Sequence, residues 1–429
     1  MEKKKGNALP VVLFAVAGIA LIALVIMILM VLKVGPFAEG SAKEKERVLH
    51  TSANGIETMD NGYMRKDLSA SELTVLMGNG INLGNTMEAY GRISLGTEAP
   101  VSSYETFWSQ PVTTQEMITG MKNAGFDTLR IPVAWTNAMD YESGDYTIRE
   151  DYLNRVEEII NYALNENMYV VINDHWDGSW WGMFGSASEE TRQKAWDLYT
   201  SMWTQIAERY KEYSDYLIFE SANEELGNRL NDTDVAADSG TLSADECYEM
   251  TLKINQKFVD IVRGTGGNNE SRFLLIAGYN TDVDMTTDDR YIMPTDPANE
   301  VNKLILSVHY YTPWGYCGNE SLSLWGTKRN YGEMNSLLES LTKFTDQGYG
   351  VIIGEYGVLV KSDGTLKKNA ALYYKNFLDN CDLYNFCPLL WDCNNLYNRQ
   401  DCKIIDDEIA ALYKERAYAN EAAMTDEEK

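Results

Sequence analysis

Two glutamates each follow a short apolar, β-prone segment of the chain. Glu224 comes shortly after Leu-Ile-Phe at 217–219, and Glu355 comes shortly after Val-Ile-Ile at 351–353. In a barrel or an open parallel sheet, buried strands run out into ligand-facing residues at their C-terminal edge. Two carboxylates brought there by different strands can act as acid/base and nucleophile on a glycosidic bond. The sequence therefore predicts that Glu224 and Glu355 form a catalytic pair.

Further polar side chains stand in or just after other apolar segments. Among them are Arg130, Asn223, Tyr311 and the two histidines His175 and His309. The third histidine, His50, lies outside the predicted domain, so both histidines within it fall at strand ends, which favours a functional role over a structural one. Histidines and glutamates can also bind a metal. No metal or cofactor site is predicted, because HExxH-type and Cys-x-x-Cys spacings are absent.

Aromatic residues are frequent, with ten tryptophans and twenty-seven tyrosines. Trp180, Trp181 and Trp314 fall in predicted loops after strands. Sugar rings have apolar C–H faces that stack on aromatic planes. Trp196 and Trp203 lie seven residues apart in a predicted helix, and we interpret them as core residues and not as sugar-binding ones. The loop tryptophans are therefore predicted to bind sugar.

Eight strand-like segments alternate with amphipathic helical segments. The predicted strands are Gly80–Leu83, Thr128–Val133, Tyr169–Asn173, Leu217–Glu220, Phe273–Ala277, Ile305–Val308, Val351–Ile353 and Cys387–Leu390. The clearest predicted helices are Glu150–Asn167, Ser188–Tyr213, Ala244–Gly264, Tyr331–Gly348 and Lys367–Asn380. Eight β–α units predict an α/β fold, the (β/α)8 TIM barrel, with its active site at the C-terminal face. A doubly wound sheet is the alternative, and the glycines at 78–84 do not open a helix as its phosphate loop would.

The N-terminus predicts a membrane anchor. Ala8–Leu32 carries no charge and exceeds the ~20 residues that a spanning helix needs, whereas the apolar core of a secretory signal has only ~7–15. Lys3, Lys4 and Lys5 place the N-terminus in the cytoplasm and the rest of the chain outside the cell. Cleavage near Ala38 or Ala42, giving a secreted protein, is the lesser alternative.

The predicted domain boundaries follow from this composition. They are a basic tip and single transmembrane helix at 1–33, a polar linker at 34–70, the barrel at 71–420 and an acidic tail at 421–429. The net charge of −27 excludes a nucleic-acid partner and fits a neutral substrate and a self-repelling, monomeric domain. Six cysteines without paired spacing are expected to be free.

Several of these segments together resemble the family 5 glycoside hydrolases, the cellulase family whose catalytic glutamates follow barrel strands 4 and 7. The resemblance spans roughly Met77 to Trp391. It rests on Gly-Ile-Asn-Leu-Gly-Asn at 80–85, Leu-Arg-Ile-Pro-Val at 129–133, Val-Ile-Asn-Asp-His at 171–175, Ile-Phe-Glu-Ser-Ala-Asn-Glu at 218–224, Ser-Val-His-Tyr-Tyr at 307–311, Ile-Gly-Glu at 353–355 and Leu-Trp at 390–391.

The resemblance implies a role for each matching residue. It makes Glu224 the general acid/base and Glu355 the nucleophile, with Asn223 near the sugar 2-hydroxyl. Arg130 and Tyr311 would hold Glu355 ionised, and His309 would lie beside Glu224. In the substrate site, the resemblance implies that His175 binds the sugar, that Trp391 stacks under it and that Asn85 is a further member. The chain departs from the family at Trp176, where many members have a second histidine, and at Glu225, where many have proline.

The predicted function is hydrolysis of β-1,4-glucan within the chain, with retention of configuration at the anomeric carbon. A negative Glu355 is expected to raise the proton affinity of Glu224. Xyloglucan, mixed-linkage glucan, mannan and xylan are alternative substrates for the same chemistry. A non-catalytic cell-surface glycan-binding protein is the alternative of another class, although it does not explain why the whole catalytic set is present.

Overall fold

The computed structural model describes residues 50–51 and 57–423. The predicted transmembrane helix at Ala8–Leu32 and most of the predicted acidic tail lie outside these residues. Within the described part of the chain, no helix has both the length and the apolar character needed to cross a bilayer. The last helix, α14 (Asp407–Ala423), runs into the beginning of the predicted tail.

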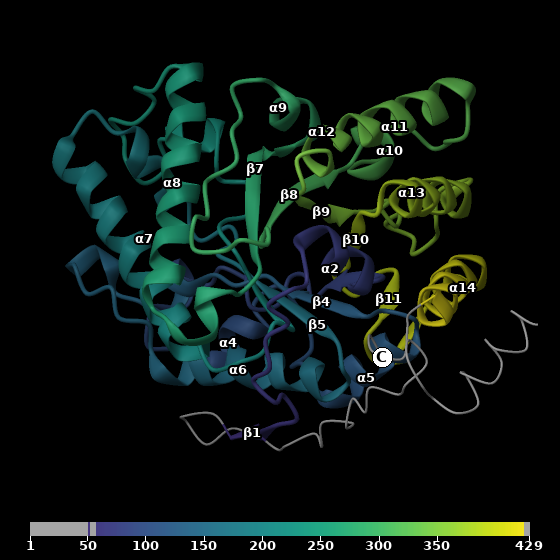
Figure 1. The fold of residues 1–429 in the computed structure, drawn as a ribbon, viewed down its shortest axis with the longest axis horizontal. Coiled ribbons are helices and arrows are strands. Elements are labelled where there is room, and N and C mark those ends of the chain that lie inside the picture. Colours follow the sequence, from purple (N-terminus) through teal and green to yellow (C-terminus); the bar gives the residue numbers. More distant parts are fainter. Residues whose placement is uncertain (1–49, 52–56, 424–429) are drawn as a thin grey trace, which may run out of the picture. The chain divides into compact units, whose positions relative to one another are not determined.

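In the described part of the chain, eight parallel strands close into a barrel (Figure 1). Their order around the barrel is β10-β3-β4-β5-β6-β7-β8-β9. The strands are β3 (Gly80–Asn82), β4 (Thr128–Ile131), β5 (Tyr169–Ile172), β6 (Leu217–Glu220), β7 (Leu274–Asp282), β8 (Leu304–Tyr310), β9 (Gly350–Tyr356) and β10 (Cys387–Leu390). Each corresponds to one predicted strand, so the predicted (β/α)8 barrel is confirmed.

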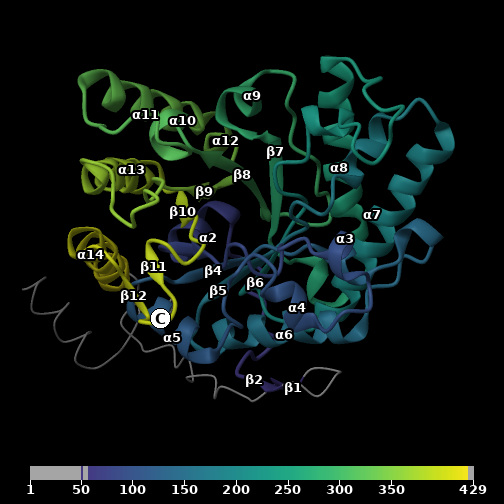
Figure 2. The ribbon, with the colours of Figure 1, turned by 180° about the vertical axis from the view of Figure 1, so that it is seen from behind.

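Helices connect the strands and cover the outside of the barrel (Figure 2). The long ones are α5 (Gln115–Asn123), α6 (Glu150–Asn165), α7 (Glu189–Tyr210), α8 (Ala244–Gly264), α11 (Lys328–Ser340) and α13 (Ala370–Tyr384). Shorter ones are α2 (Ala70–Leu76), α3 (Arg92–Leu95), α4 (Val101–Glu105), α9 (Val283–Thr287), α10 (Trp314–Cys317) and α12 (Thr342–Thr345). Two-stranded pairs are β1 (His50–Thr51) with β2 (Glu57–Thr58), and β11 (Tyr397–Asn398) with β12 (Lys403–Ile404).

Local sequence explains where several helices begin. The side chains of Ser69 and Ser243 each accept a hydrogen bond from the third backbone N–H of α2 and α8. The carboxylates of Glu72 and Glu246 in turn accept one from the backbone N–H of the cap residue. This capping box satisfies backbone donors that the first turn leaves unpaired. The predicted helix at 331–348 is two helices, α11 and α12, with Leu341 between them.

The interior of the barrel is apolar at one end, where α2 closes it. A cluster of buried side chains fills this end: Ala70, Leu73, Leu76, Met77, Tyr169, Val171, Ile218, Phe273, Leu275, Ile305, Ile352, Cys387 and Leu389. Gly350 allows the helix to come close, because a Cβ there would lie 2.6 Å from the carbonyl oxygen of Ala70. Side chains one pleat further along the strands, such as Glu220 after Ile218, belong to the other end.

The folded domain begins earlier than the predicted boundary at residue 71. Arg65 donates two hydrogen bonds of 2.9 Å to the buried Asp215, and Asp60 accepts one of 3.1 Å from the backbone of Ser214. The buried Lys303 donates to the carbonyl oxygens of Arg65 and Leu68. Residues 57–69 are therefore bound to the base of the barrel. The linker prediction was wrong for them because a polar composition is shared by linkers and by segments held through hydrogen bonds.

All six cysteines lie in the described residues and are free, as expected. The buried ones are Cys247, Cys317, Cys381 and Cys387, and the half-buried ones are Cys393 and Cys402.

Candidate active site

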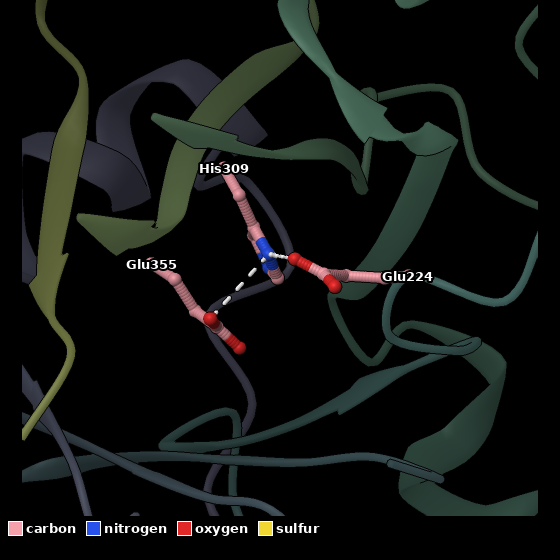
Figure 3. A group of neighbouring side chains, drawn as sticks. All are labelled: Glu224, His309 and Glu355. Atoms are coloured by element: carbon pink, nitrogen blue, oxygen red, sulfur yellow. Dashed lines mark hydrogen bonds and ion pairs between the residues drawn. The ribbon is translucent and has the colours of Figure 1, made fainter. Parts of the chain in front are cut away.

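Glu224, His309 and Glu355 converge at the C-terminal face of the barrel (Figure 3). Glu224 follows β6, while His309 and Glu355 are paired neighbours in β8 and β9. His309 Nδ1 lies 2.9 Å from Glu224 Oε1 and 3.6 Å from Glu355 Oε2. One carboxylate oxygen of each glutamate and a ring nitrogen of His309 all lie within 4.8 Å of one another. The predicted pair is therefore brought together, with an imidazole between its members.

Arg130 connects Glu355 to Glu220, Asn223 and Asn82 at this end of the barrel. Its guanidinium donates to Glu355 Oε1 at 3.1 Å, to Glu220 Oε2 at 2.7 Å and to Asn223 Oδ1 at 2.8 Å. The hydroxyl of Tyr311 donates to Glu355 Oε2 at 3.0 Å. Both oxygens of Glu355 are thus bonded, which fixes the orientation of its carboxylate.

Glu220 and Asn82 also belong to this network, although neither was among the predicted site residues. Glu220 is fully buried, pairs with Arg130 and accepts a 2.8 Å hydrogen bond from Ser307. Asn82 accepts a 2.8 Å bond from Arg130 and donates to the carbonyl oxygen of Gly354. Glu220 could have been found from the sequence, because residues two apart in a strand face the same way and Ile218 faces inward.

The protonation preferences of the site differ from those expected. Burial favours the neutral form of His309, but the nearby Glu355 and Glu224 outweigh it and raise the pKa of His309. Burial opposes ionisation of Glu224, yet its hydrogen bond with His309 and the histidine charge lower the pKa of Glu224. Burial raises the pKa of Glu355, although His309 and Arg130 oppose this effect.

The pKa of Glu224 is thus lowered, whereas a negative Glu355 was expected to raise its proton affinity. Burial of Glu355 is the first cause of its raised pKa, and two contacts that the sequence did not reveal act beside it. Arg130 pairs with both Glu355 and Glu220. It therefore stabilises the anion of Glu355 less than it would if Glu355 were its only partner. His309 contacts Glu224 at hydrogen-bonding distance, whereas its distance to Glu355 is longer.

A cavity of about 330 Å³ opens beside the two glutamates. Its lining includes Glu224, Glu355, Tyr311, Trp314 and Trp391. Trp314 is 61% exposed and packs edge-on against Tyr311, so its ring is accessible from the cavity. Trp391 and Trp314 therefore stand where their predicted contact with a sugar is sterically open.

His175 lies beside this cavity, against Trp391. The two rings are parallel within 10°, with centroids 5.7 Å apart. Burial, with a smaller contribution from Arg130, holds the pKa of His175 well below its ordinary value. His175 is therefore a neutral side chain that supports the Trp391 ring.

Two of the predicted sugar-binding tryptophans are in the wrong environment for that role. Trp180 and Trp181 stack on each other at 4.4 Å and contact Phe184 and Tyr199. Their exposed fractions are 0% and 1%, so neither offers a ring face to a ligand. The loop after β5 folds back into a short 3-10 helix, which buries both rings beneath α7.

Asn85 is half-buried and does not line the cavity. Its backbone, at a φ of 59°, donates to the buried Glu88. A role of its side chain in binding substrate stays a prediction.

Comparisons with known proteins agree with this geometry. The family model described as cellulase (glycosyl hydrolase family 5) matches residues 94–396. Endoglucanase A of Paenibacillus barcinonensis is 36% identical over 375 residues, which cover 81% of this chain and 87% of that protein. The xyloglucan-specific endo-beta-1,4-glucanase of Bacteroides ovatus is 33% identical over 352 residues, covering 78% and 66%.

Solved structures give the same result. A broad-specificity endoglucanase from Ruminococcus champanellensis, with bound cellotriose, superimposes with a TM-score of 0.70 and 30% identity. The alignment covers 81% of this chain and 99% of that one. The family match spans most of the chain, the barrel and its C-terminal glutamates are in place, and the relatives are enzymes of one type. The chain therefore belongs to glycosyl hydrolase family 5, the cellulase family, and is a glycoside hydrolase of the endoglucanase type.

Proposed function

We propose that this enzyme cleaves β-1,4-glucan chains internally, with retention of configuration, through Glu224 and Glu355. The observation that carries the proposal is the approach of the two carboxylates to within 4.8 Å, oxygen to oxygen. Retaining glycosidases hold their carboxyl groups ~5–5.5 Å apart, whereas inverting enzymes leave ~6.5–9.5 Å for a water molecule. An approach this close between oxygens of the two carboxylates favours the retaining arrangement.

In this mechanism Glu355 attacks the anomeric carbon while Glu224 gives a proton to the departing glycosidic oxygen. A covalent glycosyl-enzyme forms, and Glu224 then takes a proton from the water that releases the sugar. Arg130 and Tyr311 hold Glu355 in place for the attack, since each donates to one of its oxygens. Asn223, fixed by Arg130, is positioned to bond a hydroxyl of the same sugar.

Glu224 obtains its proton from His309. In the free enzyme the proton favours His309, because the raised pKa of His309 and the lowered pKa of Glu224 make an imidazolium–carboxylate pair. About a third of the Glu224 side chain is exposed. A sugar that covers it removes water, which disfavours the ion pair and moves the proton across the 2.9 Å contact onto Glu224.

The substrate class follows from the open, aromatic cleft and from the relatives. Trp314 and Trp391 offer ring faces to a neutral glucan, and the acidic domain gives no reason for an anionic substrate. The relatives named above include an endoglucanase, a xyloglucan-specific enzyme and a broad-specificity enzyme. Linear β-1,4-glucan is therefore the first candidate, with xyloglucan and mixed-linkage glucan next.

We also propose that the enzyme is a monomer anchored by residues 8–32, with its catalytic domain outside the cell. The uncharged segment and the lysines before it support this topology. Cell fractionation and protease accessibility test it. Recovery of all the enzyme from the culture medium would argue for cleavage instead, and size-exclusion chromatography of the domain tests the monomer.

The function is tested by reducing-sugar release from carboxymethylcellulose, xyloglucan, mixed-linkage glucan, glucomannan and xylan. The wild-type domain is expected to act on the glucans, and both Glu224→Ala and Glu355→Ala are expected to abolish that activity. Proton NMR of the first products should show the β-anomer before mutarotation. An initial α-anomer would replace the retaining mechanism by inversion, and binding of glucan without hydrolysis would make the protein a glycan-binding module.

A further inference from the structure

Trp176, which follows His175 in the loop after β5, is exposed although its neighbours are buried. It is 38% exposed, whereas Asp174, His175 and Asp177 are 0–7% exposed. Its φ of 42° lies in the left-handed region, which is unfavourable for a bulky side chain. Strain of this kind persists only where the surrounding structure imposes it, and it concentrates at ligand sites.

Glu225 imposes the conformation of this loop. Its buried carboxylate accepts a 3.1 Å hydrogen bond from the backbone N–H of Trp176 and a 2.9 Å bond from that of Asn223. It thereby joins the loop after β5 to the segment that carries Glu224. Trp176 and Glu225 are the two positions at which the sequence departs from the common family pattern, and the structure links them directly.

Arg229 connects Trp176 to the acid/base. Its guanidinium carbon lies 5.2 Å from the centre of the Trp176 ring, and Nη2 lies 3.6 Å from Glu224 Oε2. The other oxygen of Glu224 is the one that faces His309. Glu224 therefore stands between two cations, with His309 at one carboxylate oxygen and Arg229 at the other.

Trp176 and Arg229 both lie near Glu224, yet neither lines the cavity described above. That cavity is lined by Glu355, Tyr311, Trp314 and Trp391, and its lining does not include Trp176 or Arg229. In the proposed mechanism, the sugar that Glu355 attacks occupies this cavity. The glycosidic oxygen departs toward Glu224 and away from Glu355, because bond making and bond breaking take place on opposite faces of the anomeric carbon.

We propose that Trp176 and Arg229 form the leaving-group subsite of the cleft, which holds the glucosyl unit that departs with the glycosidic oxygen. The inference rests on the proposed function. The exposed part of the Trp176 ring stacks against the C–H face of that unit, and Arg229 offers N–H donors to its hydroxyl groups. Arg229 is in addition a positioning residue for Glu224, since it contacts the oxygen that His309 leaves free.

Trp176→Ala tests the subsite by comparing two substrates with the same cellobiosyl part. Cellotetraose needs a sugar in the leaving-group subsite, whereas β-cellobiosyl fluoride releases only fluoride. Trp176→Ala is expected to lower kcat/KM for cellotetraose by roughly tenfold, the value of one lost aromatic contact, and to leave fluoride release from β-cellobiosyl fluoride within twofold. An equal loss on both substrates would show a structural role only and overturn the proposal.

Trp314→Ala is the matched control, because it removes a tryptophan from the cavity on the Glu355 side. It is expected to slow both substrates by similar factors. Arg229→Gln is expected to lower kcat/KM for cellotetraose as Trp176→Ala does, and also to move the basic limb of the pH profile for cellotetraose upward, since the charge of Arg229 lowers the pKa of Glu224. A pH profile that does not change in Arg229→Gln would show that Arg229 is not a positioning residue for Glu224.

The wild-type enzyme separates failure of this inference from failure of the proposed function. If it hydrolyses neither substrate, the proposed function fails. If it hydrolyses both and Trp176→Ala does not discriminate between them, only the leaving-group subsite fails. Thermal melts of each variant show whether an altered rate reflects lost folding instead.

Discussion

The two ends of the barrel are built from the same strands but from opposite kinds of side chain. At the end closed by α2, the interior is filled by aliphatic and aromatic groups such as Leu275 and Ile218. At the other end, the interior holds Arg130, Glu220 and Glu355 in a network in which each partner is hydrogen-bonded. One pleat separates Ile218 from Glu220.

Because of this difference, one end of the barrel contributes mainly to stability and the other end carries the ionisable groups. Burial of apolar groups stabilises the fold without constraining any ionisation state. Burial of charges costs free energy that only paired geometry offsets, and it shifts the pKa values of the groups involved. The polar end is therefore the end at which catalysis is possible, and the apolar end stabilises the barrel that carries it.

The largest expected effects belong to the catalytic pair. Glu224→Ala is expected to lower kcat on glucan by about 10²–10⁴-fold, yet to give a burst of fluoride from β-cellobiosyl fluoride, because that leaving group needs no proton. Glu355→Ala is expected to give no burst, since no glycosyl-enzyme can form. A fluoride electrode records both, and a burst from Glu355→Ala would show that another group is the nucleophile.

The next effect distinguishes the two ends by stability and activity together. Glu220→Ala leaves Arg130 without its strongest partner inside the barrel and is expected to cost about 3–5 kcal/mol of unfolding free energy, with loss of activity. Leu275→Ala at the apolar end is expected to cost about 2–5 kcal/mol and to leave kcat of the folded enzyme unchanged. Urea denaturation and assays below the unfolding transition measure both. Reduced kcat in fully folded Leu275→Ala would contradict the separation.

Glu225 gives the polar end a pH-dependent stability. Burial raises its pKa from 4.5 to about 7, so the folded state holds a proton that the unfolded state releases from about pH 4.5. Stability from this group is therefore full at low pH and declines as the pH rises from 4.5 through 7, by up to about 3 kcal/mol. Glu225→Gln is expected to reduce the decline in stability between pH 5 and pH 8, measured by urea denaturation, while the buried Glu88, whose pKa is also raised to about 7, keeps its own part of it. Leu275→Ala, as control, should retain it.

The segment at the base of the barrel is expected to have a smaller effect. A protein that begins at residue 57 keeps the hydrogen bonds of Asp60 and Arg65 to the base of the barrel. One that begins at residue 70 lacks Asp60 and Arg65 and leaves the buried Asp215 without its guanidinium, which is expected to cost about 2 kcal/mol. Thermal melts compare the two. Equal melting temperatures would restore the linker boundary at residue 70.

The smallest effect tests how Arg130 divides its charge. Glu220→Gln keeps the shape of the network but removes one negative charge, so Arg130 stabilises ionised Glu355 more strongly. Because Glu355 must be ionised to attack, the acidic limb of kcat/KM is expected to move to lower pH by up to about one unit. A shift to higher pH would mean that Glu220 does not compete with Glu355 for Arg130.

The eight strands and the members of the catalytic set could be predicted from sequence because their signals are local. An apolar run such as 217–219 favours a strand whatever its partners, and a carboxylate placed shortly after it must reach the C-terminal face once the barrel closes. The predictions for Trp180 and Trp181 were wrong for the opposite reason. Whether a loop tryptophan faces solvent or α7 depends on how the loop folds back, which no local pattern encodes.

Local sequence patterns were enough to predict the barrel, the carboxylate pair and the family. The contacts of the folded chain were needed to find that Arg130 is shared with Glu220, that His309 lies closer to Glu224 than to Glu355, and that Trp176 is held by Glu225. Strand formation and strand order follow from hydrophobic pattern and short connections, which act along the chain. Proton affinities and ring exposure depend on distances and burial among residues far apart in sequence, and those exist only after folding.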